Sequence, residues 1–212
     1  MLIQKIWKMH LESKYPHLFR EMTWPWGPVQ VKFQILDQLP PLELIAHVNL
    51  TPYLDNKWVI IQLADGSWEI PGGTLEPDEL YLDAIKRELW EEVGARLVSY
   101  GLVGAWHCRS LAGRPFRSHL PHPEFYRVVL AGEVSVISLP RFTEGSELVK
   151  NVQATPIEMV VNRFNQQGRA ELSELYQLAE ELIDGGNLNM SRVTSRPLQP
   201  HCPMSDYLRA AL

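Results

Sequence analysis

Cysteine is scarce in this chain, and its scarcity excludes several classes of protein. Among 212 residues only two are cysteines, Cys108 and Cys202, and they lie far apart in the sequence. Two distant cysteines provide neither the paired spacing of a zinc site nor the framework of bridges that stabilises small secreted domains. We therefore expect a protein of a reducing compartment and predict a cytoplasmic location.

The chain also lacks an excess of positive charge and a long apolar segment. Its net charge is −5 at pH 7, whereas domains that bind nucleic acid broadly usually carry a basic patch. Residues 1–8 contain neither the apolar core nor the cleavage site of a signal peptide, and no segment reads as a membrane span. We expect no nucleic-acid partner and no membrane partner. With 45% hydrophobic residues, the chain is long enough for one well-buried domain with extensions.

What the sequence does contain is an acidic segment with helical spacing. Glu88, Glu91 and Glu92 are three or four residues apart, so they are neighbours on one face of a helix. A second face carries apolar residues at the helical period, and we expect it to pack in the core: Leu82, Ile85, Leu89 and Val93. The segment therefore predicts an amphipathic helix that presents three carboxylates together.

Three crowded carboxylates repel one another, and only Arg87 flanks them with opposite charge. A bound cation would remove this repulsion, and a set of oxygen ligands suits Mg²⁺ or Mn²⁺ with water and phosphate completing the shell. A bare Glu-x-x-Glu-Glu is nevertheless more often a solvated helix face. The acidic spacing by itself leaves both interpretations open.

The ends of this helix can be predicted from residue types. Pro77 suits the first turn, where its missing N–H costs nothing, so we expect it to open the helix. Gly94 stands where a left-handed residue would end it. Glu79 falls on the far side of this helix from the three acids, and we expect it to be structural and bonded to the turn.

The segment from Gly73 to Ala95 resembles the signature of the Nudix hydrolases, which cleave diphosphate linkages in nucleoside diphosphate derivatives. Leu89 occupies an aliphatic position of that signature, and Asp78 replaces a usual glycine, a change that we expect to alter a turn and not the chemistry. Seven positions carry the signature's own residue: Gly73, Glu79, Arg87, Glu88, Glu91, Glu92 and Gly94.

The resemblance implies the fold, the reaction and the cofactor. The fold would be α/β, a Nudix-like α/β/α sandwich with a mixed β-sheet, which the order of expected strands and helices also favours. The activity would be metal-dependent hydrolysis of a diphosphate linkage by attack of water at phosphorus, with Mg²⁺ or Mn²⁺ as cofactor. The substrate would be a small nucleoside diphosphate derivative.

The resemblance also assigns roles to residues. Glu88, Glu91 and Glu92 would be metal ligands, joined by the carbonyl of Gly72. The catalytic residues would be Glu88, which orients or deprotonates water, together with Glu91 and with Arg87, which orients the carboxylates. The other signature residues would be structural: Gly73, Glu79 and Gly94.

Other interpretations remain open at this point. In this family the base sometimes lies outside the signature, and Glu144 and Glu147 are candidates for such an acid. A non-hydrolytic nucleotide sensor or interaction module with the same fold is the main alternative function. A prenyl diphosphate isomerase is a weaker one, with Cys108 and His107 as its slender support. A nucleoside triphosphate, a nucleotide sugar and an ADP-ribose-like compound all remain candidate substrates.

The rest of the chain divides into three regions. Residues 1–40 form an N-terminal extension with a short helix and a strand, residues 41–185 the Nudix hydrolase domain, and residues 186–212 a polar tail that would suit a partner or a homodimer. Trp24 and Trp26 could wall a nucleotide base, although such pairs more often pack a segment onto a core. Strands are expected at residues 29–35, 47–50, 58–63, 67–70, 97–106 and 125–137, and helices at residues 156–164 and 170–183.

A basic segment between residues 107 and 122 is the last candidate for function. It contains Arg109, Arg114 and Arg117 and no acidic residue, and its prolines and glycine predict a loop. Arginine pairs well with phosphate, so these three residues are candidates for substrate binding. The histidines His119 and His122 have no further ligands nearby in the sequence, which argues against a zinc site.

Overall fold

The computed structural model describes residues 2–24, 27–138 and 149–193, with side chains from residue 6 onward. In this part of the chain ten strands join in one sheet, in the order β1-β2-β7-β8-β3-β4-β5, with β10 beside β7, β6 beside β3 and β9 beside β4. The strands are β1 (Met22–Trp24), β2 (Val29–Ile35), β3 (Ile45–Leu54), β4 (Lys57–Leu63), β5 (Trp68–Glu69), β6 (Gly72–Thr74), β7 (Ala95–Ser110), β8 (Glu124–Val136), β9 (Val149–Thr155) and β10 (Ser191–Arg192).

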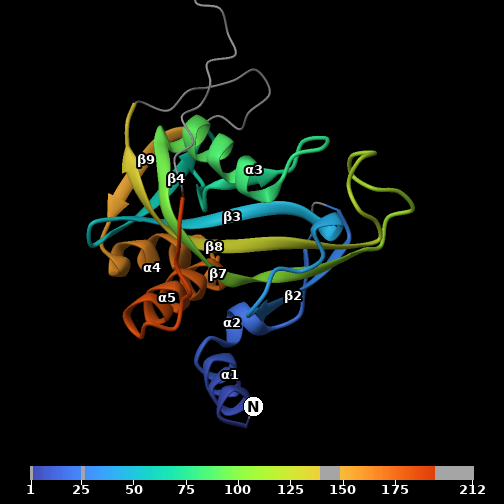
Figure 1. The fold of residues 1–212 in the computed structure, drawn as a ribbon, viewed down its shortest axis with the longest axis horizontal. Coiled ribbons are helices and arrows are strands. Elements are labelled where there is room, and N and C mark those ends of the chain that lie inside the picture. The colour runs from blue at the N-terminus through green and yellow to red at the C-terminus, as the bar shows by residue number, and fades with distance from the viewer. Residues whose placement is uncertain (1, 25–26, 139–148, 194–212) are drawn as a thin grey trace, which may run out of the picture.

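The sheet is mixed because β3 and β8 run parallel while its other described pairs are antiparallel. Helices cover both faces, with α3 on one side and α4 and α5 on the other (Figure 1). The helices are α1 (Leu2–Lys14), α2 (Pro16–Phe19), α3 (Tyr81–Glu88), α4 (Ile157–Gln166) and α5 (Ala170–Asp184), with a 3₁₀ turn η1 (Leu42–Leu44) and a π turn η2 (Leu89–Val93). The predicted α/β/α sandwich with a mixed sheet is confirmed.

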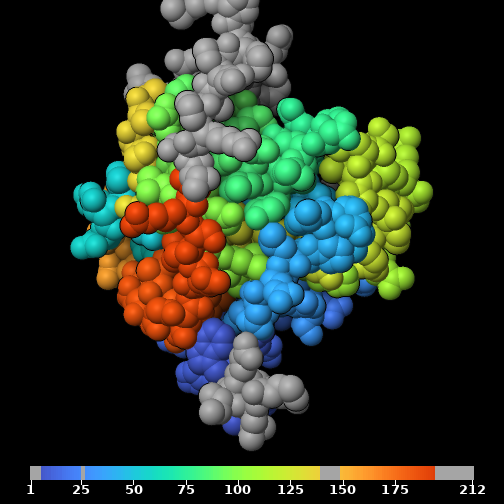
Figure 2. All heavy atoms as spheres, in the orientation of Figure 1, coloured from blue at the N-terminus to red at the C-terminus, as the bar shows by residue number. Residues whose placement is uncertain are grey.

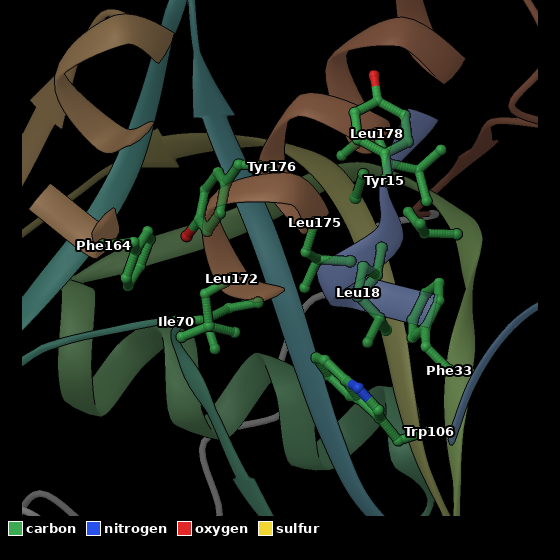
Figure 3. Packing of buried hydrophobic residues seen from close by; sticks show 14 of the residues in the cluster. Tyr15, Leu18, Phe33, Ile70, Trp106, Phe164, Leu172, Leu175, Tyr176 and Leu178 are labelled. Atoms are coloured by element: carbon green, nitrogen blue, oxygen red, sulfur yellow. The ribbon is translucent and has the colours of Figure 1, made fainter. Parts of the chain in front are cut away.

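Alternation along the central strands separates two cores. In β8, Val128 and Leu130 face α3, whereas Val129 and Ala131 face the α5 side. The larger core joins α5 to the N-terminal region, and Figure 3 shows Leu175 of α5 beside Leu18 of α2 within it. The predicted apolar helix face lies in the smaller core, where Ile85, Leu89 and Val93 are buried and Leu82 is half-buried.

The N-terminal region is built into this sheet. Strand β2 pairs along β7 from Val29 opposite Ser110 to Ile35 opposite Gly104. In α2, the Leu18 N–H donates to Glu174 of α5 at 2.8 Å, and the side chain of Leu18 is fully buried. The first two helices and the first two strands therefore extend both the sheet and its α5-side core.

Two boundaries differ from the sequence expectation. The basic segment was expected to be a loop from residue 107, but β7 continues to Ser110 because β2 pairs with it over that length. In the C-terminal region, β10 pairs with β7 and Leu188 is buried against Gly101. Residues 194–212 of the expected tail lie outside the described part of the chain. Among the described helices, no segment combines the length and the apolar character that a membrane span requires.

Candidate active site

The glycine turn before α3 lies against the neighbouring strand. Strand β6 pairs with β3, with Gly72 opposite Asn49 and Gly73 opposite Val48. Gly72 has φ 143°, and a β-carbon there would overlap the Val48 carbonyl oxygen and approach Asn49. Only glycine allows this approach, so the turn and β3 form one rigid edge.

Gly73 has a different reason to be glycine. A β-carbon at this position would overlap the carboxylate of Glu88, which lies directly on the Gly73 backbone. Glu88 is the last residue of α3, and its side chain is only 12% exposed. The missing side chain of Gly73 is therefore the space that holds the Glu88 carboxylate.

The helix begins later than Pro77, contrary to expectation. Leu80 has an extended backbone and caps α3, which starts at Tyr81. The residues before it form a turn in which Asp78 has φ 62°, a left-handed conformation that cannot continue a helix. This is the position where the resembled signature has glycine, and the structure shows the turn that glycine would suit.

Glu79 closes that turn and reaches the acidic cluster. Its Oε2 accepts the Glu76 N–H at 2.9 Å, so the predicted bond to the turn is confirmed. Both of its oxygens accept from Arg87, at 2.9 Å from Nε and 3.0 Å from Nη2. Its expected place on the far side of the helix was wrong, because Glu79 precedes the helix and folds back onto Arg87.

Arg87 lies at the centre of the acidic cluster and contacts three of its carboxylates. Its Nη1 donates to Glu88 Oε1 at 2.8 Å and lies 3.5 Å from Glu91 Oε2. Its Nη2 also reaches the carbonyl of Thr74 at 3.4 Å. The Glu79 hydrogen bond, followed by the charge of Glu88, raises the pKa of Arg87 above its usual range. One guanidinium thus holds three acids and the glycine turn together.

The electrostatics differ between two of these acids. Burial raises the pKa of Glu88 above its ordinary value, although Arg87 opposes the change. Burial acts in the same direction on Glu79, but the hydrogen bonds from Arg87 and Glu76 outweigh it and lower its pKa. Glu88 is therefore the more proton-accepting of the two, and Glu79 the more firmly ionised.

The last turn of the helix widens from α to π over Leu89–Val93 and ends at Gly94. Gly94 has φ 68° and its N–H bonds to the Leu89 carbonyl, so the predicted left-handed stop is confirmed. Glu92 lies in this π turn, is 6% exposed, and accepts the Gly72 N–H at 2.9 Å. The helix end and the glycine turn are thereby joined a second time.

The oxygen atoms of this cluster are the candidate ligands for a metal ion. As the side chains lie, no group of three or more His, Cys, Asp or Glu within the described ranges is arranged to hold one. Arg87 engages Glu88 and Glu91, and the Gly72 N–H engages Glu92. The donors are nonetheless all oxygen, and the space at Gly73 holds a buried carboxylate, which fits a hard divalent cation. A bound cation would share Glu88 and Glu91 with Arg87.

A polar cluster beside this edge was missed from the sequence. Arg127 of β8 donates through Nη2 to His47 Nε2 at 2.9 Å and to Asn49 Oδ1 at 3.3 Å. His47 Nδ1 lies 3.3 Å from Thr74 Oγ1 on β6. Because guanidinium only donates, His47 must be neutral with its hydrogen on Nδ1. The polar residues at positions 47 and 49 of a largely apolar strand were the available sign.

One arginine of the basic segment, the exposed Arg117, acts on this cluster through its charge. Burial, then the charges of Arg127 and Arg117, lower the pKa of His47 well below its ordinary value. Arg109 points elsewhere, with its Nε 3.4 Å from Oε1 of Glu124 on β8. Arg114 is exposed. The segment is also tied to the site by His119, whose Nε2 is 2.9 Å from the Leu75 carbonyl.

Five other sequence candidates remain, of which the structure describes two, Trp24 and Cys108. Trp24 stacks on Arg127 at 4.8 Å and meets Trp106 edge to face at 5.9 Å. Cys108 is buried, and burial raises the pKa of its thiol to about 12, which removes the support that it offered to an isomerase. Glu144, Glu147 and Trp26 lie outside the described part of the chain.

The fold and the site define an α/β/α protein whose helix end presents three buried or half-buried carboxylates beside a glycine turn. The family model described as the NUDIX domain matches residues 55–176, which is more than half of the chain. The chain belongs to the NUDIX domain family.

Curated relatives support this membership over part of their length. The chain is 38% identical to a MutT-like protein of Streptomyces ambofaciens over 68 residues, covering 32% of this chain and 44% of that protein. It is 41% identical to the CTP pyrophosphohydrolase of Escherichia coli over 69 residues, covering 32% of this chain and 50% of that enzyme. The chain thus spans about half the length of the curated relatives it matches.

Among solved structures, the pyrophosphohydrolase BsRppH of Bacillus subtilis is 22% identical, with a TM-score of 0.47. The match covers 64% of this chain and 77% of that one. A structure titled UDP-X diphosphatase is 18% identical, with a TM-score of 0.45, over 70% of this chain and 66% of that one.

Proposed function

We propose that this protein is a metal-dependent hydrolase that cleaves a diphosphate linkage in a nucleoside diphosphate derivative. The observation that carries the proposal is the half-buried Glu88 carboxylate, which lies against Gly73 and is held by Arg87 at the end of α3. The raised pKa makes Glu88 a better proton acceptor than an ordinary glutamate. The names of the curated relatives, which include a CTP pyrophosphohydrolase, support the same class of reaction.

In this mechanism Glu88, Glu91, Glu92 and the Gly72 carbonyl are the groups that would hold Mg²⁺ or Mn²⁺. When bound, the cation neutralises phosphate oxygens and lowers the pKa of bound water. Glu88 takes one proton from the attacking water, whose oxygen forms a bond to phosphorus. The bond from phosphorus to the bridging oxygen breaks, and that oxygen leaves on the second phosphate group. Arg87 keeps Glu88 and Glu91 oriented throughout.

Arg117 is the arginine of the basic segment that we assign to the substrate phosphates. Its charge reaches His47, which is bonded to Thr74 of the turn that holds the acids. Guanidinium groups bind phosphate in a bidentate manner, so Arg117 would stabilise the anionic substrate. Arg117→Ala should raise the Michaelis constant while leaving turnover largely intact. An unchanged Michaelis constant in Arg117→Ala would remove this assignment; Arg109 and Arg114 stay sequence predictions.

The test of the activity is a hydrolysis screen with Mg²⁺ and Mn²⁺ over nucleoside triphosphates, nucleotide sugars, ADP-ribose and dinucleoside polyphosphates. We place nucleoside triphosphates first because the Escherichia coli relative is named for CTP. Glu88→Gln should reduce turnover roughly a hundredfold or more by removing the base, and Glu91→Gln should also reduce it strongly. Asp83→Asn is the matched control, since Asp83 lies on the same helix and is 63% exposed.

A second pair of variants tests the space at Gly73. Gly73→Ala should abolish turnover because the new methyl group displaces the Glu88 carboxylate. Gly113→Ala should leave turnover unchanged, because a β-carbon there meets nothing within 4 Å. Normal turnover in Gly73→Ala and Glu88→Gln would overturn the mechanism. Tight nucleotide binding without turnover by the unaltered protein would favour the alternative, a non-hydrolytic sensor.

A further inference from the structure

A cavity of about 780 Å³ opens on the molecule away from the acidic cluster. It is lined by Trp7 of α1, residues 35–39 after β2, Tyr81 at the start of α3, residues 100–103 of β7, and residues 187–189 after α5. Figure 2 shows the hollow between the blue segment after β2 and the red segment after α5. Its volume lies within the range of small-molecule sites.

The cavity exists because one edge of β7 is left open. Strand β2 pairs with β7 only as far as Gly104, and β10 begins its pairing at Tyr100. Among the described strands none pairs with residues 101–103 on that edge. Leu188 packs over Gly101, where a β-carbon would overlap it, and forms part of the floor. Backbone groups and apolar side chains therefore share the base of the cavity.

The walls combine aromatic rings with carboxamides. Trp7, Tyr81 and Tyr100 come from three different elements, and burial, followed by the neighbouring Tyr100, raises the pKa of the Tyr81 hydroxyl. The carboxamide side chains at the rim can both donate and accept: Gln38, Asn187 and Asn189. Rings suit stacking on a planar ligand, and carboxamides suit the mixed donors and acceptors on the edge of a nucleobase.

The charge of the cavity argues against a phosphate group. Among the described residues no lysine or arginine lines it. The nearby Lys8 Nζ is already bonded to the Ile35 carbonyl at 3.2 Å and to Asp37 at 3.0 Å. A phosphate would lie near the Asp37 carboxylate and would have to draw Lys8 away from it, which is unfavourable in a partly enclosed site. The ligand that fits is planar, uncharged and rich in hydrogen-bonding groups.

The cavity is separate from the proposed catalytic site. None of the four signature glutamates lines it. Tyr81 precedes Glu91 by ten residues of helix, a separation of roughly 15 Å along the axis. Six lining residues precede residue 55 and five follow residue 176, so most of the wall is built by segments outside the family match.

We propose that this cavity binds the uncharged ring system of a nucleoside or nucleobase. The aromatic walls stack on the ring, and Gln38, Asn187 and Asn189 hydrogen-bond to its edge. Binding requires no metal ion and no signature glutamate. The site therefore goes beyond the proposed hydrolysis and does not depend on it.

The experiment is calorimetric titration of the full chain with adenosine, guanosine, cytidine and uridine in the absence of divalent metal. We expect saturable binding of at least one nucleoside, with equal affinity in Glu91→Gln. Trp7→Ala should weaken that binding about tenfold or more, by loss of stacking. Met9→Ala is the matched control, because Met9 lies on the same helix and is 60% exposed.

Asn189→Ala provides a second test that does not depend on whether Trp7→Ala folds. Asn189 is exposed, so its removal should weaken binding severalfold without affecting the fold. No binding of any of the four nucleosides at millimolar concentration would overturn the proposal, as would binding that neither Trp7→Ala nor Asn189→Ala changes. Metal-dependent hydrolysis without nucleoside binding would contradict the proposed nucleoside site and leave the proposed activity intact. Nucleoside binding without hydrolysis would contradict the proposed activity and leave the nucleoside site intact.

Discussion

Arg87 shows how a single residue can organise a site. Its guanidinium reaches Glu79, Glu88 and Glu91, and it also touches the carbonyl of Thr74. Crowded carboxylates would otherwise repel one another, so this cation makes the cluster compatible with a stable fold. The same residue couples the turn before α3 to the end of that helix, which explains why the signature requires both Glu79 and Arg87 at fixed spacing.

Glu79→Gln tests the structural part of this coupling. Its lowered pKa means that Glu79 contributes stability above the ordinary carboxylate pKa, and that this contribution is lost as pH falls through the folded-state value. We expect the variant to lower the free energy of unfolding by about 2 kcal/mol at pH 7, because two charge-assisted hydrogen bonds are weakened. Urea unfolding at pH 7 and at about pH 3 measures the difference.

At the acid end of that range the parent and Glu79→Gln should converge in stability. Asp83→Asn, an exposed change on the same helix, serves as the comparison and should be nearly neutral at both pH values. An equal loss at pH 7 and pH 3 would show that Glu79 acts by packing and not by charge.

At the scale of elements, alternation and helical period predicted the long strands and helices well. The run 29–35 became β2, and the alternation in it matches its buried and exposed residues. The short strands β1, β6 and β10 were missed because two or three residues carry no period. The seven-residue β9 was also missed, because its apolar residues Val149, Val152 and Ala154 do not alternate regularly. The π turn was also missed, since a local change of helical pitch depends on the packing and bonding of Glu92 and Gly94.

Leu18→Ala tests whether the N-terminal elements belong to the core. Leu18 of α2 is fully buried between α5 and β2, so its truncation leaves a cavity. We expect a loss of about 3 kcal/mol in the free energy of unfolding. Met9→Ala, on the exposed face of α1, should change it by less than about 0.5 kcal/mol. A loss under 1 kcal/mol in chemical denaturation of Leu18→Ala would mean that the N-terminal elements are dispensable.

At the scale of the whole molecule, segments from both ends of the chain complete the sheet around a central domain. The family match covers residues 55–176, yet β2 and β10 both pair with β7 inside it. Tyr15 and Lys14 meet Glu181 at 2.6 and 2.8 Å, which joins the N-terminal helices to α5. The flanking segments therefore stabilise the family domain and form most of the wall of the proposed nucleoside cavity.

Two truncations isolate the contribution of residues 187–193. One removes residues after Val193 and the other removes residues after Gly186. The shorter protein should have a lower melting temperature, because it loses the β10 pairing and the burial of Leu188, worth about 2 kcal/mol. Differential scanning calorimetry of the two truncated proteins measures the difference in melting temperature. Size-exclusion chromatography of both, compared with the full chain, tests the predicted homodimer. Identical melting temperatures would contradict the role given to β10 and Leu188.

The sequence by itself determined the acidic helix, its glycine stop and the set of residues that place the chain in its family. These features depend on spacing along one helix and on residue types, which are local properties. Gly73 shows what such local properties leave out. The signature identifies it as glycine, but the physical reason is the Glu88 carboxylate, which folding places against its backbone.

Only the tertiary structure decided which distant groups meet at the site and which do not. Arg127 bonds to His47 because β3 and β8 lie side by side, and Arg109 meets Glu124 because β7 runs on to Ser110 beside β8. The same is true of the cavity, whose walls come from both ends of the chain. Pairing across a sheet joins residues that no periodicity along the chain relates, and this is why the acids were predictable and their surroundings were not.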